Sequence, residues 1–180
     1  MVVFDTSILL LVLDSGAKAP IDPETGMSVE KAAQRIEYLI ESLASQKETI
    51  VIPTPVLSEV LVHSGEAMEA YLDTLNGQAV FRVAPFDQKA AIEAALSLRD
   101  AIKRGGHRVD AANPDATKTK IKFDRQIVAI AKAEGAKVIY SDDSDVHNYA
   151  ARAGLETYRT SDLGLPPEDP QHSMDFGKDN

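Results

Sequence analysis

The chain has 180 residues, 44% of them hydrophobic, no cysteine and a formal net charge of -9. This length supports one domain with its own hydrophobic core, and the lack of cysteine excludes disulfides and thiolate zinc sites. The acidic balance argues against a protein that coats nucleic acid nonspecifically, because such binding relies on Lys and Arg.

The first element is the apolar run Val2 to Phe4, which ends in Asp5 and predicts a strand, a polar turn and a helix. An N-terminal apolar strand of an α/β fold is usually central in a parallel sheet, which places Asp5 at the carboxyl edge. An Asp at this place can also simply cap the helix. The run does not have the flanks of a signal peptide, and no stretch reaches the roughly 18 apolar residues of a membrane span, so we expect a cytoplasmic protein.

The next elements continue the α/β alternation. After a turn-rich loop over residues 15–28, we expect a helix from Val29 to Leu43, a strand from Thr49 to Ile52 and a helix that Thr54 caps. Glu59 lies about one turn into this last helix, near the same carboxyl edge. By itself it could be an ordinary solvated charge.

The middle of the chain predicts a short helix over residues 66–75, a strand over 79–83 and a long helix over 87–103. The segment from Arg104 to Lys122 then loses all periodicity and carries five basic residues against two acids. We expect a mobile loop that contacts the phosphate backbone of RNA, although a solvated loop whose lysines have no such contact fits the sequence almost as well. The residues assigned to this contact are Lys118, Lys120 and Lys122.

Carboxylates stand at both ends of one folding unit, from Lys122 to Val146. Asp124 opens a predicted helix, which Gly135 ends, and Lys137 to Tyr140 predicts a buried strand. The acids that follow this strand are Asp142, Asp143 and Asp145. Since ligand sites of open α/β sheets form beyond the carboxyl ends of the strands, these acids should meet Asp5 and Glu59 there.

The C-terminal part predicts a helix over residues 146–153 and a last strand over 155–158. Proline and acidic residues dominate beyond Ser161. We therefore expect a domain over residues 1–160 and a poorly ordered acidic tail over residues 161–180.

Oxygen ligands gathered at one edge favour a hard divalent cation, Mg²⁺ or Mn²⁺. Such ions can generate hydroxide from bound water and stabilise the leaving oxygen of a phosphodiester. The four expected catalytic and metal-binding acids are Asp5, Glu59, Asp124 and Asp143. Asp142 is a further expected metal ligand beside them.

Three motifs, in this order and spacing, resemble those of PIN-domain ribonucleases, especially the toxin components of toxin–antitoxin pairs: VVFDTS, PVLSEVL and FDRQIVAIAKAEGAKVIYSDDSDV. The resemblance implies a three-layer α/β/α fold with a central parallel sheet of order 3-2-1-4-5 and a metal-dependent endoribonuclease activity. It also implies an antitoxin partner and a homodimer, which the stripe of Ile36, Leu39 and Leu43 permits, although this stripe could equally be part of the core. By motif position, Ser7 and Ser141 resemble supporting polar residues, and Asp145 acts from outside the metal ligands.

Two other functions compete with the nuclease. A haloacid-dehalogenase-like phosphatase also has a strand that ends in Asp, but its second Asp would stand where this chain has Ser7. A PIN-like module that binds RNA or protein without cleavage is disfavoured by the intact set of four acids.

Overall fold

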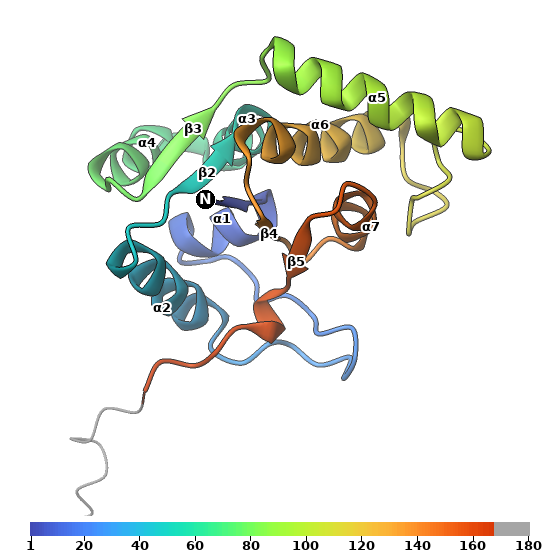
Figure 1. Ribbon diagram of the computed structural model, residues 1–180. Helices are drawn as coiled ribbons and strands as arrows, with labels where there is room; N and C mark the ends of the chain where they lie inside the picture. Colours follow the sequence, from blue (N-terminus) through green and yellow to red (C-terminus); the bar gives the residue numbers. More distant parts are fainter. Residues whose placement is uncertain (168–180) are drawn as a thin grey trace, which may run out of the picture.

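The computed structural model describes residues 1–167 as a parallel sheet between layers of helices (Figure 1). The strands are β1 (Val2–Phe4), β2 (Ile50–Pro53), β3 (Phe81–Ala84), β4 (Val138–Tyr140) and β5 (Glu156–Tyr158). The α-helices are α1 (Thr6–Leu13), α2 (Ala32–Ser45), α3 (Thr54–His63), α4 (Met68–Gly77), α5 (Gln88–Arg104), α6 (Lys118–Glu134) and α7 (Ser144–Arg152), and two 3-10 turns are η1 (Gly65–Ala67) and η2 (Thr160–Asp162).

The strand order is β3-β2-β1-β4-β5 and all four pairings are parallel, which confirms the predicted fold. The N-terminal strand β1 is central: Val2 is in register with Ile50 of β2 on one side and with Val138 of β4 on the other. The carboxyl ends of these three strands therefore open onto one edge, which is where a site of an α/β sheet is expected.

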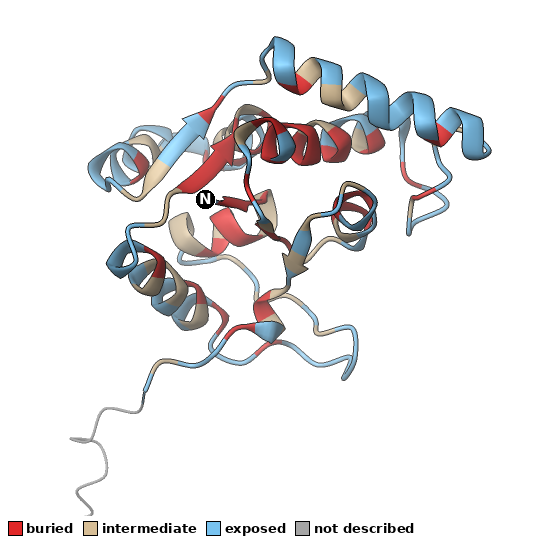
Figure 2. Ribbon diagram, in the orientation of Figure 1, coloured by how far each residue is buried: buried red, intermediate tan, exposed pale blue. Residues whose placement is uncertain are grey.

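Successive residues of β1 point to opposite faces and enter two separate cores. Val3 belongs to the cluster that contains Ile139 of β4 and Ile130 of α6. Phe4 belongs to the cluster that contains Ile36 of α2. Figure 2 shows the result, with buried residues concentrated on β1, β2 and α6 and exposed residues along the outer helix α5. Burial on both faces explains why β1 is apolar throughout.

The apolar stripe of α2 lies inside the protein. Ile36 is fully buried, Leu43 is 7% exposed, and Leu39 packs against the same core cluster. The stripe that the sequence offered for homodimerisation is therefore occupied by the contacts of the chain with itself.

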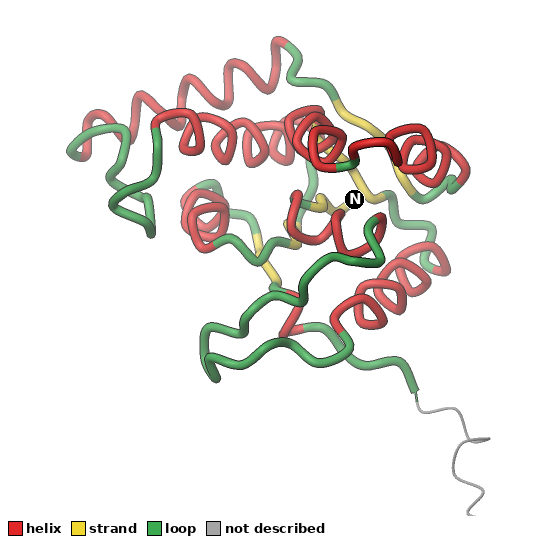
Figure 3. Tube along the Cα trace, turned by 180° about the vertical axis from the view of Figure 1, so that it is seen from behind, coloured by secondary structure: helices red, strands yellow, loops and turns green. Residues whose placement is uncertain are grey.

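Helix α6 begins at Lys118, so the loop predicted to reach Lys122 spans only residues 105–117 (Figure 3). Thr117 caps the helix, since its Oγ1 accepts a hydrogen bond from the Lys120 amide at 3.1 Å. The loop is also tied down, because Arg104 donates two hydrogen bonds of 2.7 Å to the buried carboxylate of Asp110. The expectation of a long basic loop was wrong at its C-terminal end.

The packed domain continues past residue 160. Thr160 in η2 is fully buried, Leu163 is 9% exposed, and Arg35 of α2 donates a hydrogen bond to the Leu163 carbonyl. The part of the predicted acidic tail over residues 168–180 lies outside the described residues. Across residues 1–167, no helix has the length and apolarity needed to cross a membrane.

Candidate active site

Four acidic side chains from four segments line one cleft at the carboxyl edge of the sheet. Asp5 follows β1, Glu59 lies on α3, Asp124 lies on α6 and Asp143 follows β4. The cleft has a volume of about 580 Å³ and is also lined by Lys120. The topology accounts for this convergence, because strand ends and the helices that start there share one edge.

Asp5 is the most deeply placed of the four. It is 5% exposed, and burial raises its pKa to about 7, although a hydrogen bond of 2.6 Å from the Ser141 hydroxyl acts to lower it. The same Ser141 oxygen accepts a hydrogen bond from the Asp143 amide at 3.0 Å. Ser141 thus connects the ends of β1 and β4, the two strands that carry Asp5 and Asp143.

Glu59 of α3 also lines the cleft and is exposed. Its Oε2 accepts a hydrogen bond of 2.7 Å from the hydroxyl of Thr6, the residue after Asp5. Thr6 therefore connects α3 to the end of β1. The neighbouring Ser7 accepts a hydrogen bond of 3.0 Å from the Asp142 amide and so fixes the backbone that follows β4.

Three carboxylates gather around one point on the α6 side of the cleft. Asp124, Asp143 and Asp145 each offer an oxygen, and these oxygens lie within 4.8 Å of one another. The Lys120 ammonium pairs with all three, at 2.7, 2.8 and 2.9 Å. Burial raises the pKa of Asp124 to about 6, against the hydrogen bond from Lys120 that lowers it.

Asp145 also binds the loop over residues 105–117, in addition to its contact with Lys120. It is 2% exposed, and its Oδ1 accepts hydrogen bonds from the Ala112 and Asn113 amides at 2.6 and 3.1 Å. Burial acts to raise the pKa of Asp145, but the bonds from Lys120 and from the two amides outweigh it and hold the pKa below its usual range. Asp145 therefore attaches the loop over residues 105–117 to the cleft.

The carboxylate of Asp142 does not join this group. Its two oxygens accept hydrogen bonds from the amide and the hydroxyl of Thr160, at 2.9 and 2.7 Å. Its backbone carbonyl accepts a further bond of 2.6 Å from Arg159. Asp142 thus anchors η2 to the end of β4, whereas Asp143, the next residue, faces the cleft.

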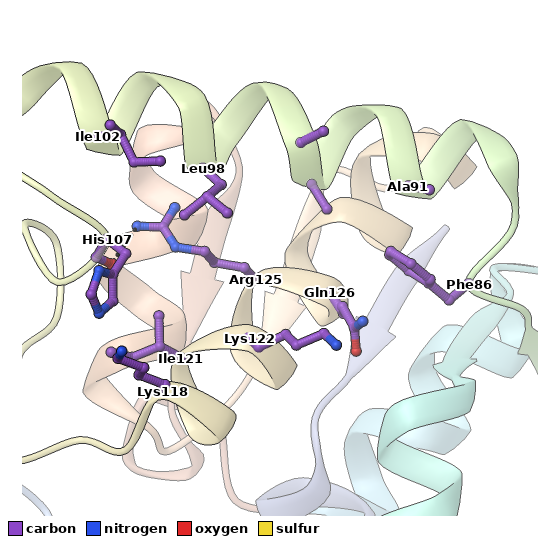
Figure 4. Close-up of a pocket in the computed structure, with 12 residues that line it drawn as sticks. Phe86, Ala91, Leu98, Ile102, His107, Lys118, Ile121, Lys122, Arg125 and Gln126 are labelled. Carbon is purple, nitrogen blue, oxygen red and sulfur yellow. Dashed lines mark hydrogen bonds between the residues drawn. The ribbon is translucent and has the colours of Figure 1, made fainter.

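The three lysines expected to contact RNA fall on two sides of α6. Lys120 lines the cleft with Asp124, one helical turn further along. Lys118 and Lys122 line a separate groove between α5 and α6, together with Arg125 (Figure 4). Placement on a helix explains the division, because residues i and i+4 share a face and residue i+2 does not.

Sequence reasoning did not single out Thr6 or His147 as contributors to the site. His147 on α7 contacts the Ser141 carbonyl through Nε2 at 2.6 Å and the Thr157 hydroxyl of β5 through Nδ1 at 2.9 Å. It fixes the segment that carries Ser141 and Asp143. Its position directly after the third motif, two residues after Asp145, is the only signal that the sequence gives.

The arrangement fits a hard divalent cation. The charged groups of the cleft that could ligate a cation are all carboxylates, whose oxygens are ligands that Mg²⁺ and Mn²⁺ prefer. Burial is the main cause of the raised pKa values of Asp5 and Asp124, and the neighbouring carboxylates add to it, so a bound cation would favour the ionised forms of both acids. In addition, a lysine ammonium already lies among three of the acids, so the geometry accommodates a positive charge at that point.

No family model and no curated protein sequence matches the chain. Solved structures resemble it over most of its length. A chain of FitAB bound to an IR36 DNA fragment is 15% identical over 91% of this chain and 98% of that chain, with a TM-score of 0.58. A chain of VapBC2 from Rickettsia felis bound to a DNA fragment from their promoter is 15% identical over 88% and 98%, with a TM-score of 0.57. A chain of DNA-bound VapBC from Salmonella typhimurium is 15% identical over 88% and 97%, with a TM-score of 0.53. At this identity the likeness establishes the fold, which is a PIN-like α/β/α fold.

Proposed function

We propose that this chain with a PIN-like fold is a metal-dependent nuclease that hydrolyses phosphodiester bonds of RNA. The observation that carries the proposal is the convergence of Asp5, Glu59, Asp124 and Asp143 in one cleft at the carboxyl edge of the sheet. A cleft lined by these oxygens can hold Mg²⁺ or Mn²⁺, which when bound supplies the activated water and stabilises the leaving oxygen. The resemblance of the three sequence motifs to PIN-domain ribonucleases points to RNA as the substrate.

The residues of the chain prepare this cleft in separate ways. Asp5 and Asp143 would hold the metal from the ends of adjacent strands, and Ser141 keeps them in a fixed relation through its two hydrogen bonds. Thr6 orients the Glu59 carboxylate by a bond to one of its oxygens, so the other oxygen is left for a ligand. Such anchoring lowers the entropy cost of assembling the site around a metal or a phosphate.

A purified sample tests the proposal directly. We expect cleavage of single-stranded RNA in Mg²⁺ or Mn²⁺ and none in EDTA. Asp143→Asn should keep the fold and lower the cleavage rate at least about 100-fold, since it removes a charge that holds the metal without changing the shape of the side chain. Asp73→Asn, on the exposed surface of α4, is the matched control. Equal cleavage by the wild type in EDTA would refute the mechanism.

We also propose that the chain pairs with a small antitoxin-like protein. Support comes from the structures it resembles, since the names FitAB and VapBC each denote two components and both structures contain DNA. A DNA-binding protein encoded beside this chain is the candidate to co-express, and a stable complex of the two is the expected result. The motif resemblance also implies a homodimer, which must use a surface other than the buried α2 stripe. Light scattering at micromolar concentration measures whether the protein is a dimer.

A further inference from the structure

Lys120 lies at an unusual place for a basic residue that was expected to meet RNA. Its ammonium is within 2.7 to 2.9 Å of one oxygen from each of Asp124, Asp143 and Asp145. The ammonium donates hydrogen bonds to Asp124 and Asp145 and forms a close ion pair with Asp143. The lysine therefore behaves as a ligand of the acidic group rather than as a free surface charge.

Local structure dictates this position. The Thr117 cap starts α6 at Lys118, which puts Lys120 in the first turn and Asp124 four residues later on the same face. Asp143 and Asp145 reach the same point from the start of α7. Both elements are fixed by other contacts, since Asp143 caps α7 through the Asp145 amide at 2.7 Å and Asp145 is 2% exposed.

We propose that Lys120 is an internal counter-cation, which occupies the cation position of the metal-free cleft and must leave before a divalent ion can use Asp124 and Asp143. The inference rests on the proposed function, because it concerns the metal site of that function. Two cations cannot lie among the same three oxygens, so metal binding and the Lys120 ion pairs exclude one another. The lysine keeps the acids assembled without metal and lowers the affinity of the cleft for metal.

The side chain is able to leave. The exposed fraction of its side chain is 36%, close to the 33% of the Asp143 side chain and well above the 10% and 3% of the Asp124 and Asp145 side chains, so solvent reaches the lysine while two of its three partners are held in place by burial. Its long unbranched side chain lines the cleft together with Phe123. Displacement therefore requires only rotation of the lysine side chain and no movement of α6.

The test is the affinity of the metal-stripped full-length protein for Mn²⁺, measured by calorimetry without RNA. Lys120→Met removes the charge and keeps an unbranched side chain. We expect it to bind Mn²⁺ about tenfold or more tightly than the wild type does. This factor corresponds to a modest part of the interaction energy of three close ion pairs after screening by solvent. Lys132→Met is the control, because Lys132 lies on the same helix and pairs with Glu93 at 2.7 Å, outside the cleft. Its Mn²⁺ affinity should equal that of the wild type.

Each result separates the two proposals. Equal or weaker Mn²⁺ binding by Lys120→Met, with clear binding by the wild type, overturns the role of Lys120 and leaves the metal site standing. Absence of Mn²⁺ binding in both proteins overturns the metal site and the inference with it.

Thermal unfolding gives a second readout. Lys120→Met should melt at a lower temperature than the wild type in EDTA, since three carboxylates are then without their cation, and Mn²⁺ should raise its melting temperature by more than it raises that of the wild type. If Lys120→Met does not fold in EDTA, the neutral polar variant Lys120→Gln provides the affinity. An equal Mn²⁺ effect on the melting temperatures of variant and wild type contradicts the proposal.

Discussion

Replacing Asp5 by Asn should make the protein inactive and, in its metal-free form, more stable at alkaline pH. Asn has the shape of the protonated carboxyl group and cannot ionise. Asp5 is 5% exposed and burial raises its pKa from 3.8 to about 7. At pH 8 the wild type must therefore hold an ionised carboxylate in a place that disfavours it, and the variant does not.

The magnitude follows from linkage. The pKa of Asp5 is higher in the folded state than in the unfolded state, so the folded state binds the proton more tightly and stability falls as the pH rises from 3.8 through about 7. Each pKa unit corresponds to about 1.4 kcal/mol, so Asp5 should cost the folded wild type roughly 4 kcal/mol at pH 8. About 3 kcal/mol of this destabilisation arises between pH 5 and pH 8. The raised pKa of Asp124 adds a slope of the same sign, which both proteins share.

Urea unfolding in EDTA at pH 5 and pH 8 measures this effect. We expect the free energy of unfolding of Asp5→Asn, relative to the wild type, to rise by about 3 kcal/mol between the two pH values. Differences that do not depend on pH, such as a poorer hydrogen bond with Ser141, cancel in this comparison. Asp73→Asn on the exposed surface of α4 should show no change. A relative stability of Asp5→Asn that is the same at both pH values would refute the reasoning.

Two further predictions concern residues around the cleft. Changing Lys118 and Lys122 together to Ala should weaken the binding of single-stranded RNA. The slope of the logarithm of the binding constant against the logarithm of the salt concentration should become less steep by roughly 0.7 for each phosphate that is no longer neutralised. An unchanged slope in a salt titration would exclude this face of α6 from the RNA path. Asp142→Asn should retain cleavage and metal affinity and cost about 1 kcal/mol of stability, since its carboxylate accepts hydrogen bonds only from Thr160 and not from the cleft. A weaker Mn²⁺ affinity of this variant, measured by calorimetry, would show that Asp142 is a ligand after all.

The fold and the edge that carries the acids could be predicted because they depend on local patterns. A buried strand that ends in a carboxylate occurs at Val2–Asp5 and again at Lys137–Asp143, and both strands are parallel neighbours in the sheet. The rule that such strand ends share an edge then needs no knowledge of packing. Glu59 followed in the same way from its place on the helix after β2.

The sequence could not predict in this way that Asp143 faces the cleft while the Asp142 carboxylate binds Thr160. The two residues are identical and adjacent, and only the contact with Thr160, 18 residues further along the chain, turns the first away from the cleft. Lys120 posed a similar difficulty, because its direction depends on where α6 begins. The run of Lys and Thr before Ile121 masks the helix start, and a shift of the start by one residue would rotate Lys120 by about 100° around the helix axis.

The sequence left two uses open for α2, because a stripe of apolar residues has the same pattern whether it covers a core or a partner. Ile36 is fully buried against the face of the sheet that carries Phe4. An amphipathic helix of an α/β layer needs such a stripe merely to cover the sheet. Only the three-dimensional arrangement decides which use applies.

The central position of β1 has a consequence for the order of events on the ribosome. Strand β1, which Asp5 follows, pairs with β4 through Val2 and Val138, residues that are 136 positions apart in the chain. Pairings of such long range form late, since the loop entropy must be overcome first. A nascent chain that ends before Asp143 has neither the second strand end nor the Lys120 ion pair with it. The cleft can therefore assemble only after the chain has been synthesised through Asp143, and until then the growing polypeptide does not expose an assembled acidic site to the RNA that surrounds it.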